Sequence, residues 1–160
     1  MTIQVGDKLP SATLTTMTAE GPKPLTTSEL CEGKKVVLFA VPGAFTPTCS
    51  VQHLPGFLEN AQSFKDKGVD TVACVSVNDP FVMGAWGKDR EVGENLMMLS
   101  DGNGDFTAAI GLEMDGSGFG LGTRSQRYAM IIDDGVVSTL NVESGPGLDV
   151  SSAETILSEL

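Results

Sequence analysis

The pattern of apolar and polar positions indicates short buried strands that alternate with amphipathic helices. An unbroken apolar, β-branched run at residues 36–41 is typical of a strand buried on both faces of a sheet. Pro42 and Gly43 end this run, and Pro47 is a residue favoured in the first turn of a helix. The pattern therefore places Cys49 in the first turn of a helix that follows a buried strand.

Other segments complete an alternating order of strands and helices. Further strands are expected at residues 12–18, 69–77, 96–99, 128–132 and 136–142, with a hairpin turn at 133–135. Helices are expected at 54–67 with a kink at Pro55–Gly56, at 80–92 with Asp79 as N-cap, and at 151–160. Shorter helical turns are expected at 27–30 and 106–110. This order predicts one α/β domain over residues 1–160, with a mixed central β-sheet flanked by helices.

Charge and composition exclude several classes of protein. The 160 residues are 41% hydrophobic and 19% charged, which is typical of a folded globular chain. A net charge of −11 argues against nucleic acid and against an anionic membrane surface as partners, because both require a basic face. The first residues lack the features of a signal peptide, and no run approaches the length of a membrane span. We therefore expect a cytoplasmic protein.

Three widely spaced cysteines, Cys31, Cys49 and Cys74, form no C-x-x-C pair. This spacing excludes a disulfide framework, a thioredoxin-type redox motif and a zinc knuckle. Cys31 is expected in a loop without chemistry. Neither the acidic turn at 101–105 nor the glycine-rich loop at 116–122 has the ligands of a calcium or phosphate site, so no metal or cofactor is expected.

A thiol at a helix start needs a cation to become mostly thiolate. Lowering a thiol pKa from ~8.5 to about 6 requires ~3.4 kcal/mol, whereas a helix terminus supplies about 2 kcal/mol at most. Among the ten lysines and arginines, Arg124 and Arg127 stand out, since Arg127 directly precedes the apolar run at 128–132. Arg127 either holds its guanidinium against the thiolate or is a solvated residue at a strand end.

Three other residues near Cys49 have two interpretations each. The Thr46 hydroxyl either caps the helix or bonds to the thiolate or its substrate. Pro42 either ends the strand only or also shields the sulfur from water. His53, the only histidine, is four residues after Cys49, but a base on the same helix would lack an orienting third residue, so a catalytic-base role is disfavoured.

Several long motifs resemble those of a known family. The segments are Pro42-Gly43-Ala44-Phe45-Thr46-Pro47-Thr48-Cys49-Ser50, His53-Leu54-Pro55-Gly56-Phe57, Val75-Ser76-Val77-Asn78-Asp79-Pro80-Phe81 and Gly120-Leu121-Gly122-Thr123-Arg124-Ser125-Gln126-Arg127-Tyr128. They resemble the type II peroxiredoxins, the branch of the plant type II enzymes and mammalian peroxiredoxin five. The resemblance covers nearly the whole chain and implies a thioredoxin fold.

The resemblance also implies an activity and a site. Cys49 would be the peroxidatic nucleophile of a thiol-dependent peroxidase acting on hydrogen peroxide and alkyl hydroperoxides, with Pro42, Thr46 and Arg127 completing the catalytic site. The family commonly forms homodimers through a face near this site. Such a contact would use Phe45, Phe81, Phe119 and Leu121, each of which is equally compatible with a place in the core.

The family branches at the reducing step. The position that aligns with the resolving cysteine of the mammalian branch is Val150, and Cys74, the match to the second plant cysteine, lies in the middle of a strand. We therefore expect a one-cysteine cycle in which glutathione or glutaredoxin, or alternatively thioredoxin, reduces Cys49. The alternative function is a peroxide-sensing redox relay or holdase in which Cys49 is oxidised without fast turnover.

Overall fold

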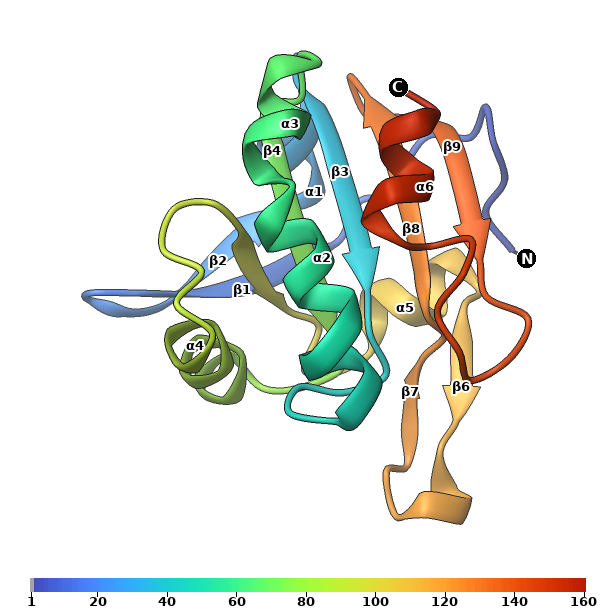
Figure 1. Cartoon of the computed structure of the whole chain (residues 1–160). Helices are drawn as coiled ribbons and strands as arrows, with labels where there is room; N and C mark the ends of the chain where they lie inside the picture. Colours follow the sequence, from blue (N-terminus) through green and yellow to red (C-terminus); the bar gives the residue numbers. More distant parts are fainter. Residues whose placement is uncertain (1) are drawn as a thin grey trace.

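A mixed seven-stranded β-sheet forms the centre of the protein (Figure 1). The computed structural model describes residues 2–160. The strand order is β2-β1-β5-β4-β3-β8-β9, and a separate hairpin, β6–β7, projects beyond the sheet (Figure 1). The strands are β1 Thr13–Thr18, β2 Gly21–Thr26, β3 Lys35–Ala40, β4 Thr71–Ser76, β5 Met97–Ser100, β6 Glu113–Asp115, β7 Thr123–Ser125, β8 Tyr128–Asp133 and β9 Val136–Val142.

Strand direction within the sheet is mixed, as the sequence predicts. The three central strands β3, β4 and β5 are parallel, whereas β8 runs antiparallel to β3. The antiparallel register ends with Ala40 opposite Tyr128. The chain that leaves β3 therefore lies beside the chain that enters β8. The site described below lies at this end of the two strands.

Helices cover both faces of the sheet (Figure 1). They are α1 Thr27–Cys31, the π-helical turn η1 Cys49–His53, α2 Leu54–Glu59, α3 Ala61–Asp66, α4 Pro80–Asp89, α5 Asp105–Ile110, the 3-10 turn η2 Ser117–Phe119 and α6 Ala153–Ser158. One core cluster joins the sheet to α2, α3, α4 and α6, and the other joins it to α1 and α5. Alternate residues of each central strand enter the two clusters because successive strand side chains point to opposite faces.

Pro55 marks a change in helix geometry rather than a simple kink. The Leu54 N–H donates to the carbonyl of Cys49, five residues earlier, which closes a π-helical turn over 49–53. Proline lacks an N–H and its ring crowds the carbonyl four residues before it, so a wider turn relieves the conflict. A second break lies at Asn60, between α2 and α3. The prediction of a kink at Pro55–Gly56 is therefore corrected to a π-turn before Pro55 and a break after it.

Two short hairpins escape prediction from the sequence. β2 contains Pro22 and Pro24, which argue against a strand, but β2 is an edge strand where a missing N–H is tolerated. The glycine-rich loop 116–122 is the tip of the β6–β7 hairpin.

Cys31 was expected in a loop, but it is the last residue of α1 and is buried. Within residues 2–160, no helix has both the length and the apolar character needed to cross a membrane.

Candidate active site

The register of the sheet brings Cys49 and Arg127 together. Cys49 follows β3 after the loop 41–46 and two helical residues, Pro47 and Thr48, and Arg127 is the residue directly before β8. Because Ala40 pairs with Tyr128, these two segments meet where β3 ends and β8 begins. Arg127 is two residues before Ala129, so in an extended chain their side chains point to the same face of the sheet. The side chain of Ala129 belongs to the core cluster that contains Cys49. The guanidinium therefore points to the face on which the thiol lies.

Arg127 forms a direct hydrogen bond with the candidate nucleophile. Its Nη2 donates to the sulfur of Cys49 at 3.0 Å, and Nη1 lies 2.9 Å from Nδ1 of His53. Arg127 is only 6% exposed, so it is not a solvated residue at a strand end. Both ion pairs in the described part of the chain involve other residues. The positive charge of Arg127 is therefore available to a thiolate at Cys49.

His53 is a buried, neutral partner of Arg127. Burial, followed by the charge of Arg127, lowers the pKa of His53 to about 3. Nε2 lies 2.9 Å from the carbonyl of Ser151. Since that carbonyl can only accept, the proton is on Nε2 and Nδ1 accepts from Arg127. A histidine held in this way is a poor base, in agreement with the expectation from the sequence.

The loop that carries Pro42 is held from two sides. Arg124 donates from Nη1 to the carbonyl of Pro42 at 3.1 Å and from Nε to the carbonyl of Leu121 at 2.9 Å. On the other side, the Ala44 N–H donates to Oδ1 of Asn78 at 2.9 Å. The sequence singled out Arg124, and the structure places it against this loop rather than against the sulfur.

Thr46 does not cap the helix with its side chain. Its hydroxyl donates to the carbonyl of Gly43 at 2.6 Å, while its own carbonyl accepts from the N–H of Ser50. With the hydroxyl proton engaged, the lone pairs of Oγ1 are left to accept a hydrogen bond from another group. This geometry favours the interpretation in which Thr46 contacts a substrate.

The other two cysteines are buried thiols. Cys74 lies opposite Phe39 in the middle of the sheet and is fully buried, and burial raises its pKa well above that of an ordinary thiol. Burial likewise raises the pKa of Cys31 to about 11. Both groups therefore remain protonated and unreactive in the folded protein. All three cysteines are free thiols.

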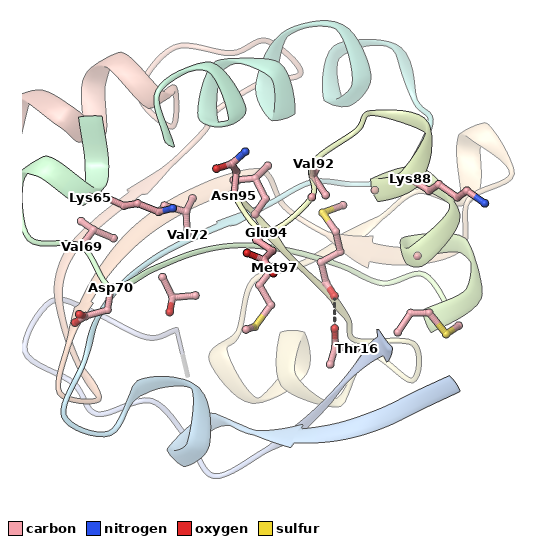
Figure 2. Close-up of a pocket in the computed structure, with 17 residues that line it drawn as sticks. Thr16, Lys65, Val69, Asp70, Val72, Lys88, Val92, Glu94, Asn95 and Met97 are labelled. Atoms are coloured by element: carbon pink, nitrogen blue, oxygen red, sulfur yellow. Dashed lines mark hydrogen bonds between the residues drawn. The ribbon is translucent and has the colours of Figure 1, made fainter. Parts of the chain in front are cut away.

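A cavity of about 580 Å³ lies beside α4, β1 and β5, and Cys49 is not among the residues that line it (Figure 2). Its lining includes Met17, Met97 and Met98, together with side chains of both charges such as Lys65 and Glu94. None of the four predicted site residues lines it. Across residues 2–160, no three metal-ligating side chains are grouped closely enough to hold a metal ion.

Three large aromatic side chains are exposed, and one of them, Phe45, lies in the loop that precedes Cys49. Phe45 is 51% exposed, Phe81 66% and Phe119 87%, whereas Leu121 is partly buried. The three phenylalanines are therefore not core residues of this chain, whereas the dimer contact stays a prediction. Phe45 also has a positive φ of 65°, an uncommon conformation for a bulky residue.

Comparisons with known proteins agree with the family that the sequence motifs resemble. The Redoxin family model matches residues 4–157. Peroxiredoxin-2E, chloroplastic, from Arabidopsis thaliana is 52% identical over 162 residues, which cover 99% of this chain and 69% of that protein. Peroxiredoxin-2B from the same organism is 50% identical over 160 residues, which cover 99% of this chain and 98% of that protein.

Solved structures give the same result. The crystal structure of reduced Prx3 from Vibrio vulnificus in complex with hydrogen peroxide matches with a TM-score of 0.94 and 59% identity, and covers 98% of each chain. This similarity confirms the thioredoxin fold that the sequence motifs implied. The chain therefore belongs to the Redoxin family and, within it, to the type II peroxiredoxins, which are thiol-dependent peroxidases.

Proposed function

We propose that Cys49 is the peroxidatic residue of this antioxidant peroxidase and that Arg127, Thr46 and Pro42 complete its catalytic site. The observation that carries the proposal is the 3.0 Å hydrogen bond from Arg127 to the Cys49 sulfur. Burial alone disfavours a thiolate, and a fixed guanidinium offsets that penalty without losing its own charge. The nucleophile therefore has a cation at the sulfur itself.

The reaction transfers one oxygen atom to sulfur. The Cys49 thiolate attacks the terminal oxygen of a hydroperoxide, so that an S–O bond forms as the O–O bond breaks. Sulfur is oxidised to a sulfenic acid, and the departing oxygen leaves as water or an alcohol once it gains a proton. Arg127 stabilises the negative charge that moves from sulfur to the leaving oxygen.

Thr46 and Pro42 orient the substrate and exclude water. Thr46 already donates to the carbonyl of Gly43, so its oxygen is oriented to accept a hydrogen bond from the peroxide O–H. Pro42 lies in the loop held by Arg124 and has no N–H that would require solvation. Cys49 itself is 1% exposed, which favours hydrogen peroxide and small alkyl hydroperoxides over bulky ones.

The positions of the other thiols support a proposal for the reducing half of the cycle. Cys74 is fully buried in β4, and Val150 stands where the mammalian branch has a resolving cysteine. We therefore assign a one-cysteine cycle. Glutathione attacks the sulfenic acid and releases water, and glutaredoxin with a second glutathione then removes the mixed disulfide as oxidised glutathione.

The assembly and the location belong to the same proposal. The exposed Phe45, Phe81 and Phe119 are suited to a homodimer contact near the site, since large exposed apolar side chains commonly mark interfaces. A cytoplasmic location would keep glutathione and glutaredoxin reduced, as the cycle requires. Sedimentation velocity of the wild type and of Phe119→Arg tests the dimer: the variant is expected to be the smaller species, and an unchanged coefficient would contradict the interface.

Steady-state turnover with different reductants tests the cycle. Peroxide consumption is measured with glutathione alone, with glutathione plus glutaredoxin, and with thioredoxin plus its reductase. We expect catalytic turnover with glutathione and glutaredoxin. Turnover with thioredoxin alone would contradict the assigned reductant, and consumption of a single equivalent of peroxide would instead indicate the redox-sensor role.

A further inference from the structure

A continuous series of hydrogen bonds runs from the surface to the candidate nucleophile. The carboxylate of Glu143 accepts from the N–H and the hydroxyl of Ser151 at 2.8 Å and 2.6 Å. The Ser151 carbonyl accepts from Nε2 of His53, whose Nδ1 accepts from Arg127. Arg127 then donates to the sulfur of Cys49. Five residues from three separate parts of the sequence are thus joined, and Arg127 donates to both of its neighbours in the series, His53 and Cys49.

The partner of Arg127 in this series is neutral, which has an electrostatic consequence. A buried arginine is most often held by a carboxylate, which neutralises the guanidinium. His53 is instead a neutral acceptor, 1% exposed and with a strongly lowered pKa. It fixes the direction of the guanidinium and leaves the positive charge to the thiolate. A protonated histidine could not accept this bond and would repel Arg127.

Packing fixes the ring of His53 in this orientation. The ring lies 5.0 Å from that of Phe39 and 5.5 Å from that of Phe57, measured between centroids. The π-helical turn places Cys49 and His53 at its two ends. The imidazole therefore has little freedom to rotate away from Arg127, and both of its nitrogens have fixed partners.

We propose that His53 is a positioning residue: its Nδ1 orients Arg127 toward Cys49, and the segment 143–151 anchors the imidazole through the Ser151 carbonyl. The inference rests on the roles proposed above for Cys49 and Arg127. It explains why the only histidine of the chain is buried beside the site without contacting the sulfur in any hydrogen bond of the described residues.

Two substitutions of His53 distinguish the role of Nδ1 from the role of Nε2. In His53→Asn, the side-chain oxygen can occupy the place of Nδ1 and accept from Arg127, but the contact with Ser151 is lost. In His53→Gln, the longer amide can reach the Ser151 carbonyl in place of Nε2, but the acceptor for Arg127 is lost. Phe64→Leu is the matched control, since Phe64 stacks on Phe57 in the same cluster, whereas the rings that pack on His53 are those of Phe39 and Phe57.

The readouts are kcat/KM for hydrogen peroxide and the thiolate titration of Cys49 by ultraviolet absorbance. We expect His53→Gln to lower kcat/KM about tenfold or more and to move the titration up by roughly one pH unit. His53→Asn should retain most of both properties. Phe64→Leu should lower the melting temperature and leave both readouts unchanged.

Two results would overturn the proposal. One is a His53→Gln protein whose melting temperature falls while its titration and kcat/KM stay within about twofold of the wild type, since this indicates a purely structural role. The other is an equal loss of activity in the Asn and Gln variants. If His53→Gln fails to fold, Glu143→Gln tests the anchor by the same readouts: a smaller upward shift in the titration supports it and an unchanged titration contradicts it.

Failure of this inference is distinguishable from failure of the proposed function. If Cys49 were not the nucleophile, Cys49→Ser would retain peroxidase activity whatever the state of His53. If only the positioning role were wrong, Cys49→Ser would be inactive and His53→Gln would behave as the wild type.

Discussion

Nη2 of Arg127 lies 3.0 Å from the sulfur of Cys49, although 78 residues separate them in sequence. The antiparallel pairing of β3 with β8 brings the two residues together, and His53 holds the other side of the same guanidinium. The electrostatics of the site thus depend on the register of a sheet and on a neutral imidazole. The following predictions separate the contributions of these residues.

Arg127→Gln removes the cation at the sulfur. We expect kcat/KM for hydrogen peroxide to fall by about 10²–10³ and the thiolate titration of Cys49 to move up by about one to two pH units. Stopped-flow kinetics and ultraviolet titration measure the two effects. Arg90→Gln is the control, since it removes the same charge from a surface pair with Asp89. Equal behaviour of the two variants would remove Arg127 from the site.

Thr46→Val replaces the hydroxyl by a methyl group of similar size. Thr46 bonds to the carbonyl of Gly43, so the substitution removes an acceptor for the peroxide and leaves the Arg127–Cys49 bond in place. We expect kcat/KM to fall about 10²-fold with an unchanged thiolate titration, and Thr46→Ser to restore most of the activity. A shifted titration in Thr46→Val would instead show that the hydroxyl acts on the sulfur.

Cys74→Ala tests the one-cysteine cycle. The thiol is fully buried in β4 and its pKa is raised, so we expect turnover within about twofold of the wild type and a stability loss of about 1 kcal/mol. Activity assays and chemical denaturation measure these values. Loss of turnover, together with a Cys49–Cys74 disulfide in the intact mass of the oxidised wild type, would contradict the cycle.

The buried histidine makes stability depend on pH. The pKa of His53 is lowered from 6.5 to about 3 in the folded protein, so the unfolded chain binds this proton at higher pH than the folded chain does. The contribution of neutral His53 to the free energy of unfolding is therefore fully present above pH 6.5. As the pH falls toward 3 this contribution is lost, by about 1 kcal/mol per pH unit.

The control for this effect is His53→Asn, which has no titrating ring. Between pH 6.5 and 4.5 the free energy of unfolding of the wild type should fall more steeply than that of the variant. Above pH 4.5 the carboxylates, including Glu143 with its lowered pKa, affect both proteins alike. Parallel curves in urea denaturation would show that His53 does not carry the effect.

The sequence predicts the order of the elements and the position of Cys49, because these follow from local patterns. The buried run at 36–41 and the helix start marked by Pro47 both correspond to observed elements. The N-cap at Asp79 is likewise confirmed, since its side chain accepts from the N–H of Val82. Such features depend on a few adjacent residues and need no knowledge of the tertiary structure.

Other features depend on contacts that a local pattern does not contain. The sequence left Arg127 with two interpretations because the pairing of Ala40 with Tyr128 is a property of the sheet. It disfavoured His53 as a base without giving it another role, and only the contacts with Arg127 and Ser151 reveal its arrangement. Strand β2 was missed because its prolines are tolerated only at a sheet edge.

Mapping of the oxidised residue tests the central claim most directly. The reduced protein is treated with one equivalent of hydrogen peroxide in the presence of a sulfenic-acid trap, and the labelled peptide is sequenced by mass spectrometry. We expect the label on Cys49 alone, formed at the rate of peroxide loss, and neither label nor peroxide loss in Cys49→Ser. A label on Cys31 or Cys74, or rapid peroxide consumption by Cys49→Ser, would contradict the account.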